Sequence, residues 1–414
     1  MSTLVVVSEQ RRRWLVGAAL TACAGLLLAR RPQLLDPQLL GVADFVQYWA
    51  AGRLNLTGGN PYALEQMLPV EQAAGWKEDW AIPMWNPFWT MTLAMPFSAL
   101  PFALARLLWL IVEFGIVLGC ADFLWRLYRG SVASRWLAWA VALTFCPTII
   151  VLRMGQLGPF QLLSLCLFLH LISKHADWGA GAVLALATVK PHLLLLFWIA
   201  LGLWILSQRR WQVAAGAGCT LLLAGAVTLA VNPHVFEQYR AALAGRLASE
   251  TLDYQAPTLG AFLRLSLGEG LSWVQYAPTV VGIAWILAYW WRKRQAWDWH
   301  RDLPLVLLVS YATALYGWLG DQVVLLVPVI QATGWLVRGS DTRTVRLMIL
   351  AYALLDGIVL AAKVAGLTEA GQFWVAPALC AGYVLLMTRL TRLGTGPCRC
   401  VGTACLHPAR PEGV

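Results

Sequence analysis

One carboxylate beyond the first apolar stretch of the chain, Asp44, stands among aromatic residues. The segment GVADFVQYWAAGRLNLTGGNPYAL covers residues 41–64 and contains Asp44, Tyr48, Trp49 and Arg53. Ionisable groups at or inside a bilayer are energetically costly, so a functional role is their default interpretation. Such a carboxylate can take a proton from a hydroxyl group. An interfacial carboxylate that only pairs with Arg53 is the alternative.

A cation lies at a break between two apolar stretches. Lys190, Pro191 and His192 interrupt the apolar residues 178–206, and proline ends or kinks a helix. Broken helices in a bilayer expose backbone polar groups, which are tolerated only beside protein or a cavity. A cation at this break can hold a phosphate, whereas a lysine that snorkels from a helix end needs no ligand.

Further polar residues lie at the ends of other apolar stretches. Arg153 and Gln156 follow one stretch, and Asp321 stands between two others. Asp321 can instead cap the helix that follows it. Arg153 and Gln156 can equally be ordinary helix-end residues. A second polar segment offers Asp253-Tyr254-Gln255 and Arg264 as further candidates.

The composition is that of a polytopic membrane protein. Of the 414 residues, 59% are hydrophobic and 13% are charged, against about 25% charged residues in average soluble proteins. The mean hydropathy is +0.63, and the 23 tryptophans suit membrane interfaces. The net charge of +10 does not indicate a nucleic-acid partner, because basic residues such as Arg292-Lys293-Arg294 lie between apolar stretches, as in cytoplasmic loops.

Apolar stretches of bilayer-spanning length predict an all-α bundle of about 10 to 12 transmembrane helices. The predicted spans are 14–29, 102–125, 136–152, 157–173, 211–231, 273–291, 303–319, 321–337, 346–366 and 372–390. The stretch 178–206 is expected to form two short half-spans. The stretch 88–100 is too short to cross comfortably and is expected to dip into the membrane or lie along it.

Residues 1–390 are predicted to form one transmembrane domain in the plasma membrane. The charge pattern predicts that both termini are cytoplasmic. Two polar segments, about 31–87 and 232–272, then lie outside the cell, and so does the candidate site. Residues 391–414 read as a disordered cytoplasmic tail, because Pro, Gly and Arg dominate there. The nine cysteines suggest no disulfide framework and match no common zinc spacing, so no metal site is predicted.

Motifs of several soluble enzyme classes are absent from the sequence. It has no phosphate-binding Walker loop, no dinucleotide glycine fingerprint, no Gly-x-Ser-x-Gly elbow and no His-Glu-x-x-His. An Asp-x-Asp pair of the kind that holds a nucleotide-sugar metal is also missing. ATP hydrolysis, redox chemistry and nucleotide-sugar use therefore have no support.

Five segments in order resemble one membrane-enzyme family. They are ADFVQYWAAGRLNLTGGNPY, WNPFWTMTLAMPFSALPFALARLLW, LRMGQLGPFQLLSL, GAGAVLALATVKPHLLL and YGWLGDQVVLLVP. Together they resemble glycosyltransferase family 87, which overlaps the family of unknown function 2029, and the resemblance covers about residues 14 to 390. The chain departs from the family pattern at two places: Asn86-Pro87 stands where the family has Pro-Pro, and Gly158-Pro159 replaces an asparagine.

The resemblance implies a GT-C-like membrane glycosyltransferase with a long first extracytoplasmic loop. Such enzymes pass a sugar, often mannose, from a polyprenyl-phosphate carrier to a lipid or glycan acceptor with inversion, and Asp44 matches their general base. No cofactor or metal is expected, because the leaving group is already a phosphate monoester. The predicted substrate-binding residues are Tyr48, Trp49, Arg53, Arg153, Gln156, Lys190, His192 and Asp321, of which Arg153, Lys190 and His192 would meet the phosphate.

Two other classes of protein share many of these features. A transporter or lipid-carrier flippase also has many helices, a broken helix and buried charge, but transporters often show paired halves, and no internal repeat is evident here. A non-catalytic scaffold of an envelope assembly would tolerate loss of Asp44. The aromatic residues Tyr48 and Trp49 are alternatively an ordinary interfacial belt.

Overall fold

Helices alone make up the regular structure of the described chain. The computed structural model describes residues 41–249, 255–339 and 342–392, and within these ranges every element is an α-helix or a 3-10 helix (η), with no strand. The predicted all-α class is thereby confirmed. The predicted span 14–29, the candidates Asp253 and Tyr254, and residues 393–414 of the predicted tail lie outside the described residues.

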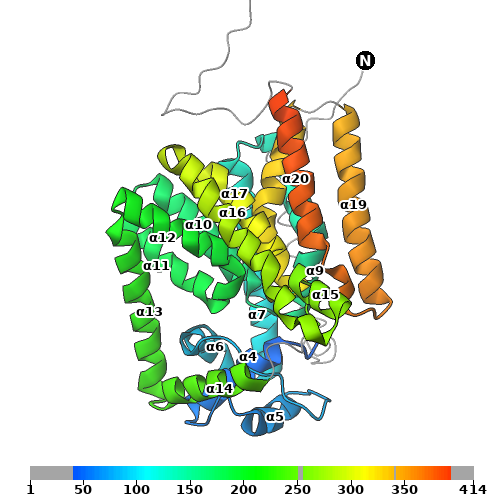
Figure 1. Ribbon diagram of the computed structural model, residues 1–414. Coiled ribbons are helices and arrows are strands. Elements are labelled where there is room, and N and C mark those ends of the chain that lie inside the picture. The colour runs from blue at the N-terminus through cyan, green and yellow to red at the C-terminus, as the bar shows by residue number, and fades with distance from the viewer. Residues whose placement is uncertain (1–40, 250–254, 340–341, 393–414) are drawn as a thin grey trace, which may run out of the picture.

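The helices form a bundle with a layer of shorter helices across one end (Figure 1). The bundle contains α7 (Phe102–Leu127), η2 (Val132–Ser134), α8 (Trp136–Thr144), α9 (Cys146–Met154), α10 (Gly158–Ser173), α11 (Asp177–Val183), η3 (Leu184–Val189), η4 (Pro191–Leu194), α12 (Leu195–Gln208), α13 (Trp211–Val231), α16 (Ala277–Lys293), η6 (Arg294–Ala296), α17 (Trp299–Ala312), η7 (Leu319–Leu325), α18 (Leu326–Gly339), α19 (Thr342–Val364), η8 (Glu369–Gln372) and α20 (Val375–Arg392). The end layer contains α4 (Phe45–Leu56), α5 (Leu64–Ala73), η1 (Phe88–Thr90), α6 (Met91–Ser98) and α14 (Val235–Ser249), and α15 (Leu259–Leu267) and η5 (Glu269–Tyr276) lead back to α16.

Seven helices of the described residues are long and apolar enough to cross a membrane, or eight if the bent pair α8 and α9 counts as one span. They are Phe102–Leu127, Pro191–Gln208, Trp211–Val231, Leu271–Ala296, Leu319–Arg338, Thr342–Val364 and Glu369–Arg392. The expectation of two half-spans over 178–206 is wrong in one respect, because Pro191–Gln208 is by itself long enough. The predicted span 303–319 ends early, since α17 stops at Ala312.

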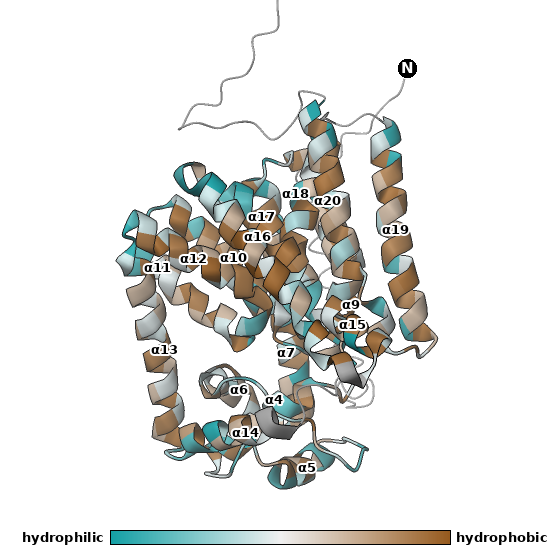
Figure 2. Cartoon of the chain, in the orientation of Figure 1, coloured by the Kyte–Doolittle hydropathy of each residue, from teal (hydrophilic) through white to brown (hydrophobic). Residues whose placement is uncertain are grey.

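Outward-facing leucines mark the surface that meets lipid. Leu222 on α13 and Leu350 on α19 are 75% and 55% exposed, and both helices are predominantly hydrophobic along their length (Figure 2). In water such exposure would be unfavourable, whereas in a bilayer it costs nothing. The outer helices are therefore built for a lipid environment.

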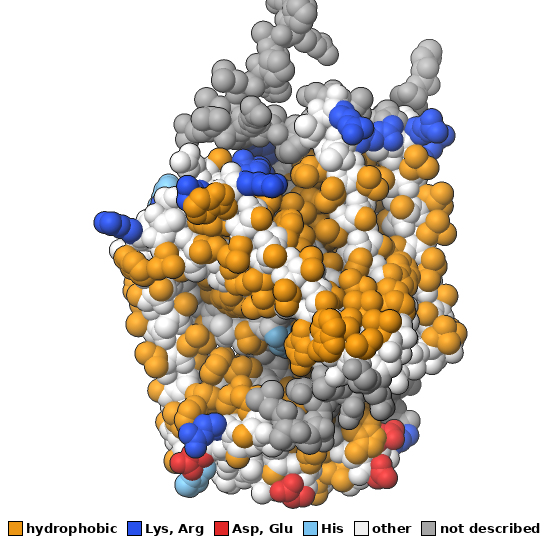
Figure 3. Space-filling model, in the orientation of Figure 1, with side chains coloured by type: hydrophobic (Ala, Val, Ile, Leu, Met, Phe, Trp, Pro, Cys, Tyr) orange, Lys and Arg blue, Asp and Glu red, His pale blue; other side chains and the backbone are white. Residues whose placement is uncertain are grey.

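The two ends of the bundle differ in charge. Helix α19 begins with Arg343 and Arg346, and α20 ends with Arg389 and Arg392. These two helices run antiparallel, so the four arginines lie at the same end (Figure 1). On the face seen in Figure 3, most lysine and arginine side chains gather at this end, whereas the visible aspartate and glutamate lie at the opposite end beside a few basic residues.

Aromatic packing fixes α4 onto α7. Phe45, Tyr48 and Trp49 are buried, and their i, i+3, i+4 spacing puts them on one helix face. The Phe45 ring lies 5.1 Å from that of Trp109, and Trp49 meets Phe102 edge-on at 5.5 Å. Because Asp44 directly precedes α4, this packing also fixes the position of its backbone.

The break at Lys190 is stabilised by two buried amide side chains. Asn86 donates to the Val189 carbonyl at 2.8 Å, and Gln161 donates to the carbonyls of Ala187 and Lys190 at 3.0 Å each. These bonds satisfy backbone oxygens that a continuous helix would have paired. The end layer and α10 therefore hold the chain at the point where the proline interrupts it.

Glu71 on α5 gives the end layer a predicted pH dependence. The side chain is fully buried, and one carboxyl oxygen accepts from the Ile82 amide at 3.0 Å. Burial raises its pKa to about 7, above the ordinary value of about 4.3. The folded state thus favours the protonated acid, so stability is lost as pH rises from the ordinary value through the raised one.

We expect Glu71→Gln to remove this pH dependence. Gln keeps an oxygen for the Ile82 amide and carries no charge to bury. At about pH 8 the variant should be more stable than wild type by at most about 3 kcal/mol, and at about pH 4 the two should be nearly equal. Thermal unfolding in one detergent across this range measures the difference. A stability difference between wild type and Glu71→Gln that stays constant with pH would show that Glu71 is not the source of the pH dependence.

Candidate active site

A cavity of about 350 Å³ lies where the end layer meets the bundle. It is lined by Asp44, Ile150, Met154, Gln156, Gln255, Trp318, Gly320, Thr368 and Glu369. Thr368 and Glu369 belong to the connection between α19 and α20. That connection is at the opposite end of these helices from their arginines, so the cavity lies away from the basic end.

The structure brings Asp44 and Gln156 together in the cavity wall. Asp44 precedes the first turn of α4 but makes no side-chain capping bond there. Its carboxylate instead accepts a hydrogen bond from Gln156 Nε2. Burial raises the Asp44 pKa above its usual value, while the Gln156 bond and the charge of Lys190 oppose that rise. The site therefore holds a carboxylate of increased basicity at the edge of an open space.

Lys190 and Asp321 form an ion pair next to this wall. Nζ of Lys190 lies 2.6 Å from Oδ1 of Asp321, and the two side chains are 12% and 1% exposed. The second Asp321 oxygen accepts from the Trp318 amide at 3.0 Å. Asp321 thus closes the first turn of η7 from inside the helix and does not occupy the N-cap position, which belongs to Trp318.

A third carboxylate, Glu369, lines the cavity and also has a lysine partner. It forms an ion pair with Lys363 and accepts from the Leu319 amide at 3.3 Å. Of the three carboxylates Asp44, Asp321 and Glu369, Asp44 alone has no cationic partner among the described residues. Asp44 is therefore the carboxylate of these three that can interact with a ligand without losing an ion pair.

The aromatic candidates Tyr48 and Trp49 lie in the protein core and do not line the cavity. Tyr48 stacks on Trp109 at 6.3 Å, and the Trp49 indole donates to the Leu100 carbonyl at 3.0 Å. Arg53 donates to the Ser98 carbonyl at 3.2 Å and lies over Trp49. Arg53 therefore does not pair with Asp44, which removes the simplest alternative reading of that carboxylate.

The other predicted phosphate-binding residues, His192 and Arg153, do not line the cavity. His192 is exposed, and its ring lies 5.7 Å from that of Tyr316. Arg153 is also exposed, and its guanidinium pairs with no carboxylate of the described chain. Glu369, Thr368 and Trp318 were not predicted from the sequence. The signal for Glu369 was a carboxylate at the start of the last apolar stretch.

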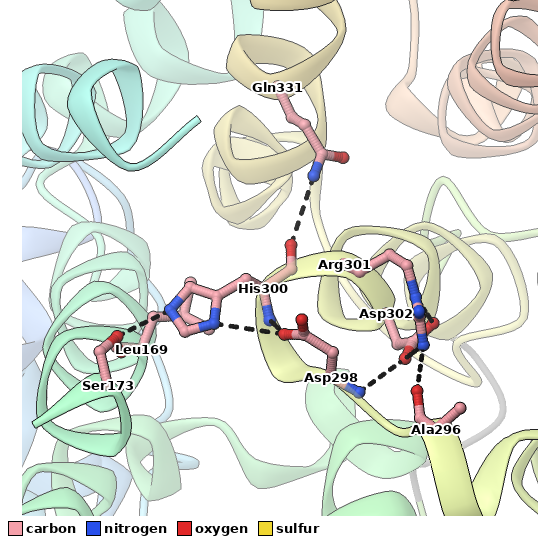
Figure 4. A network of polar contacts seen from close by, with 8 residues as sticks. All are labelled: Leu169, Ser173, Ala296, Asp298, His300, Arg301, Asp302 and Gln331. Carbon is pink, nitrogen blue, oxygen red and sulfur yellow. Dashed lines mark hydrogen bonds and ion pairs between the residues drawn. The ribbon is translucent and has the colours of Figure 1, made fainter. Parts of the chain in front are cut away.

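A second polar cluster has the residue types of a hydrolytic triad (Figure 4). Ser173 Oγ lies 2.8 Å from His300 Nε2, and His300 Nδ1 lies 3.3 Å from Asp298. However, the Ser173 hydroxyl donates its one proton to the Leu169 carbonyl at 2.7 Å, so the imidazole cannot be acting as its base. Gln331 donates to the His300 carbonyl, and the cluster ties α10, α17 and α18 together.

Comparison with known proteins supports one family. The chain matches glycosyltransferase family 87 over residues 85–310, more than half of its length. The match includes Gln156 and Lys190, whereas Asp44, Asp321 and Glu369 fall outside it. Neither the curated proteins nor the solved structures gave a significant match. With its helical bundle and apolar spans, the chain is a multi-pass membrane protein that belongs to glycosyltransferase family 87.

Proposed function

We propose that this protein transfers a sugar, mannose by preference, from a polyprenyl-phosphate carrier to a hydroxyl of a lipid or glycan acceptor. Asp44 is the general base. The observation that carries the proposal is the pairing of charges around the cavity: Asp321 and Glu369 each have a lysine, and Asp44 has only the amide of Gln156. A base must be able to accept a proton without first breaking an ion pair.

The reaction balances with the groups present. The acceptor oxygen attacks the anomeric carbon from the face opposite the phosphate and forms the new glycosidic bond. The bond from that carbon to the phosphate oxygen breaks, and polyprenyl phosphate leaves with the electron pair. The acceptor proton goes to Asp44, whose raised pKa favours its uptake. The product has inverted anomeric configuration.

Side chains near the cavity meet the leaving phosphate. Lys190 is engaged by Asp321, so a phosphate at Lys190 would share the ammonium with that carboxylate. Arg153 lies on α9 between the cavity residues Ile150 and Met154 and has an exposed side chain, whose guanidinium fork suits phosphate oxygens. His192 is the third candidate. The proposal assigns no metal and no cofactor.

The charge asymmetry supports an extracytoplasmic site. The basic end of the bundle suits the cytoplasm under the positive-inside rule, and the cavity lies at the other end. A carrier anchored in the outer leaflet of the plasma membrane would present its phosphate and sugar at this depth. The prenyl chain of the donor would stay in the lipid, against the outward-facing apolar helices.

The donor class is tested with the purified protein in nanodiscs that contain a lipid extract of the host. Radiolabelled mannose, glucose and arabinose are supplied either on polyprenyl phosphate or as nucleotide sugars. We expect label in a new product from polyprenyl-phosphate mannose, in the inverted configuration. Label from nucleotide sugars alone would contradict the proposal. In sealed proteoliposomes, movement of intact donor between leaflets with no product would indicate a transporter.

Gln156 should set the acidic limb of the pH profile of transfer. Its hydrogen bond lowers the Asp44 pKa, so Gln156→Leu should raise that pKa and shift the limb of kcat/KM to higher pH. Gly320→Ala should act in the same direction, because its new Cβ would stand 2.9 Å from Gln156 Oε1. Gln66→Leu on α5 is the control with the same side-chain change. An unmoved limb in both site variants would remove Gln156 from this role.

A further inference from the structure

Helix α9 is a short helix whose two ends both lie inside the protein. It begins after a bend of 59° from α8 and ends at Met154, and its C-cap residue Gly155 directly precedes Gln156. Ile150 and Met154 on α9 line the cavity. A helix leaves four backbone donors and four acceptors unpaired at its ends. In a bilayer these groups need protein partners, so what holds the ends of α9 also places the cavity wall.

Side chains of α7 hold the last carbonyls of α9. Arg106 Nη2 donates to the Leu152 and Arg153 carbonyls at 2.6 and 2.9 Å. The Trp109 indole donates to the Gly155 carbonyl at 3.1 Å. Arg106 is 1% exposed. A buried cation at a helix C-terminus also interacts favourably with the helix dipole.

A carboxylate of α19 holds the first amide of α9. Asp356 Oδ1 accepts from the Cys146 amide at 2.8 Å, and Asp356 is 8% exposed. The residue at the N-cap position, Phe145, offers no side-chain cap. Tyr352, one turn earlier on α19, donates to the Val141 carbonyl at 3.2 Å on the α8 side of the bend. Both sides of the break are thus satisfied by α19.

The same α7 side chains contact the residue after Asp44. The Arg106 guanidinium lies 5.8 Å from the Phe45 ring centre. Gly155 has φ +71°, and a Cβ on it would stand 2.7 Å from Phe45 Cβ and 3.3 Å from the Arg106 guanidinium carbon. Gly155, next to Gln156, and Phe45, next to Asp44, therefore pack closely against each other beside Arg106. A side chain at position 155 would not fit between them.

We propose that Arg106 and Asp356 are positioning residues that hold α9 from both ends, so that Gln156 meets the Asp44 carboxylate. Neither residue touches substrate. The inference rests on the proposed function for its catalytic consequence, but the positioning itself does not. It also explains a charged residue in each of two apolar helices, which a bilayer would otherwise disfavour.

A variant that lacks both members of a buried ion pair tests whether Arg106 positions α9 or only stabilises the fold. Arg106 Nη1 lies 3.8 Å from Glu113, which is fully buried, so Arg106→Met alone would leave an unpaired charge and can fail to fold. The double variant Arg106→Met/Glu113→Leu buries no charge and should fold. We expect its kcat for transfer to fall about 10- to 100-fold through misplacement of the α9 end. Its acidic limb should shift to higher pH, as in Gln156→Leu.

The control removes an ion pair far from the cavity. Arg210 lies 3.0 Å from Asp177, and Arg210→Met/Asp177→Asn should keep wild-type transfer and pH profile.

At the other end of α9, Asp356→Asn keeps an acceptor oxygen for Cys146 and should retain transfer, whereas Asp356→Leu should not. A folded Arg106→Met/Glu113→Leu variant with wild-type kcat, or with reduced kcat and an unmoved acidic limb, would overturn the proposal.

Hydrogen exchange tests the positioning without any donor. Amides of residues 146–156 should exchange faster in Arg106→Met/Glu113→Leu and in Asp356→Leu than in wild type, while peptides of α13 and α16 stay unchanged. Unchanged exchange over 146–156 would refute the inference even if transfer is observed. If wild type transfers no sugar but these amides exchange faster in the variants, the proposed function fails and the positioning stands.

Discussion

Asp44→Asn should reduce kcat for sugar transfer by about 10²- to 10⁴-fold, the usual contribution of a positioned general base. Asparagine is nearly isosteric and keeps an oxygen that can accept from Gln156, but it cannot take the acceptor proton. Because Asp44 makes no ion pair among the described residues, its neutralisation leaves no buried cation unpaired. The variant should therefore fold and should still bind the donor.

The matched control is Asp79→Asn, the same substitution at an exposed aspartate of the end layer. It should transfer at the wild-type rate. Initial rates at saturating donor and acceptor, measured in nanodiscs, give kcat for each protein. A fall of less than about threefold for Asp44→Asn would show that another group accepts the proton, and Glu369 would be the next carboxylate to replace.

Lys190→Met should be the most destabilising single substitution near the cavity. It leaves the Asp321 carboxylate, 1% exposed, without its cation. Breaking a buried pair by removing one partner costs about 3–5 kcal/mol. The double variant Lys190→Met/Asp321→Asn should recover most of that loss, because Asn carries no charge and can still accept from the Trp318 amide.

Thermal unfolding in a single detergent measures both variants. Lys293→Met provides the control, since Asp302 keeps Arg301 at 2.8 Å when Lys293, 3.9 Å away, is removed. Its effect should stay below about 1 kcal/mol. Equal stability of Lys190→Met and wild type would contradict the assignment of a stabilising buried ion pair to Lys190 and Asp321.

Sequence patterns were sufficient for the membrane fold and the helix break. Span length, proline position and charge clusters are local properties, and they predicted α7, α13, α19 and α20 closely. They failed where a helix end depends on packing. The stop of α17 at Ala312 and the bend between α8 and α9 are examples, because the partners that satisfy those backbones come from distant helices such as α19.

The site was predicted in part. Asp44, Gln156, Lys190 and Asp321 each carry a polar group at the end of an apolar stretch, which is a local signal, but their pairing across more than a hundred residues is not. Glu369 reaches the cavity only because the connection from α19 to α20 folds over it.

The predicted sugar contacts of Tyr48 and Trp49 relied on a weaker signal. Aromatic residues next to an apolar stretch suit a membrane interface or a ligand. The spacing of Phe45, Tyr48 and Trp49 also suits one buried helix face, and this is where the structure places them. Composition alone cannot separate these environments, because the ring is apolar in each of them.

The most direct test of the central claim measures donor binding and single-turnover transfer together, in wild type and in Asp44→Asn. Both proteins are placed in identical nanodiscs with radiolabelled polyprenyl-phosphate mannose and the host's lipid extract. We expect both proteins to bind the labelled donor and only wild type to move the label to an acceptor. Equal transfer by both proteins would contradict the role of Asp44. Donor binding by wild type with no transfer to any acceptor would contradict the proposed reaction.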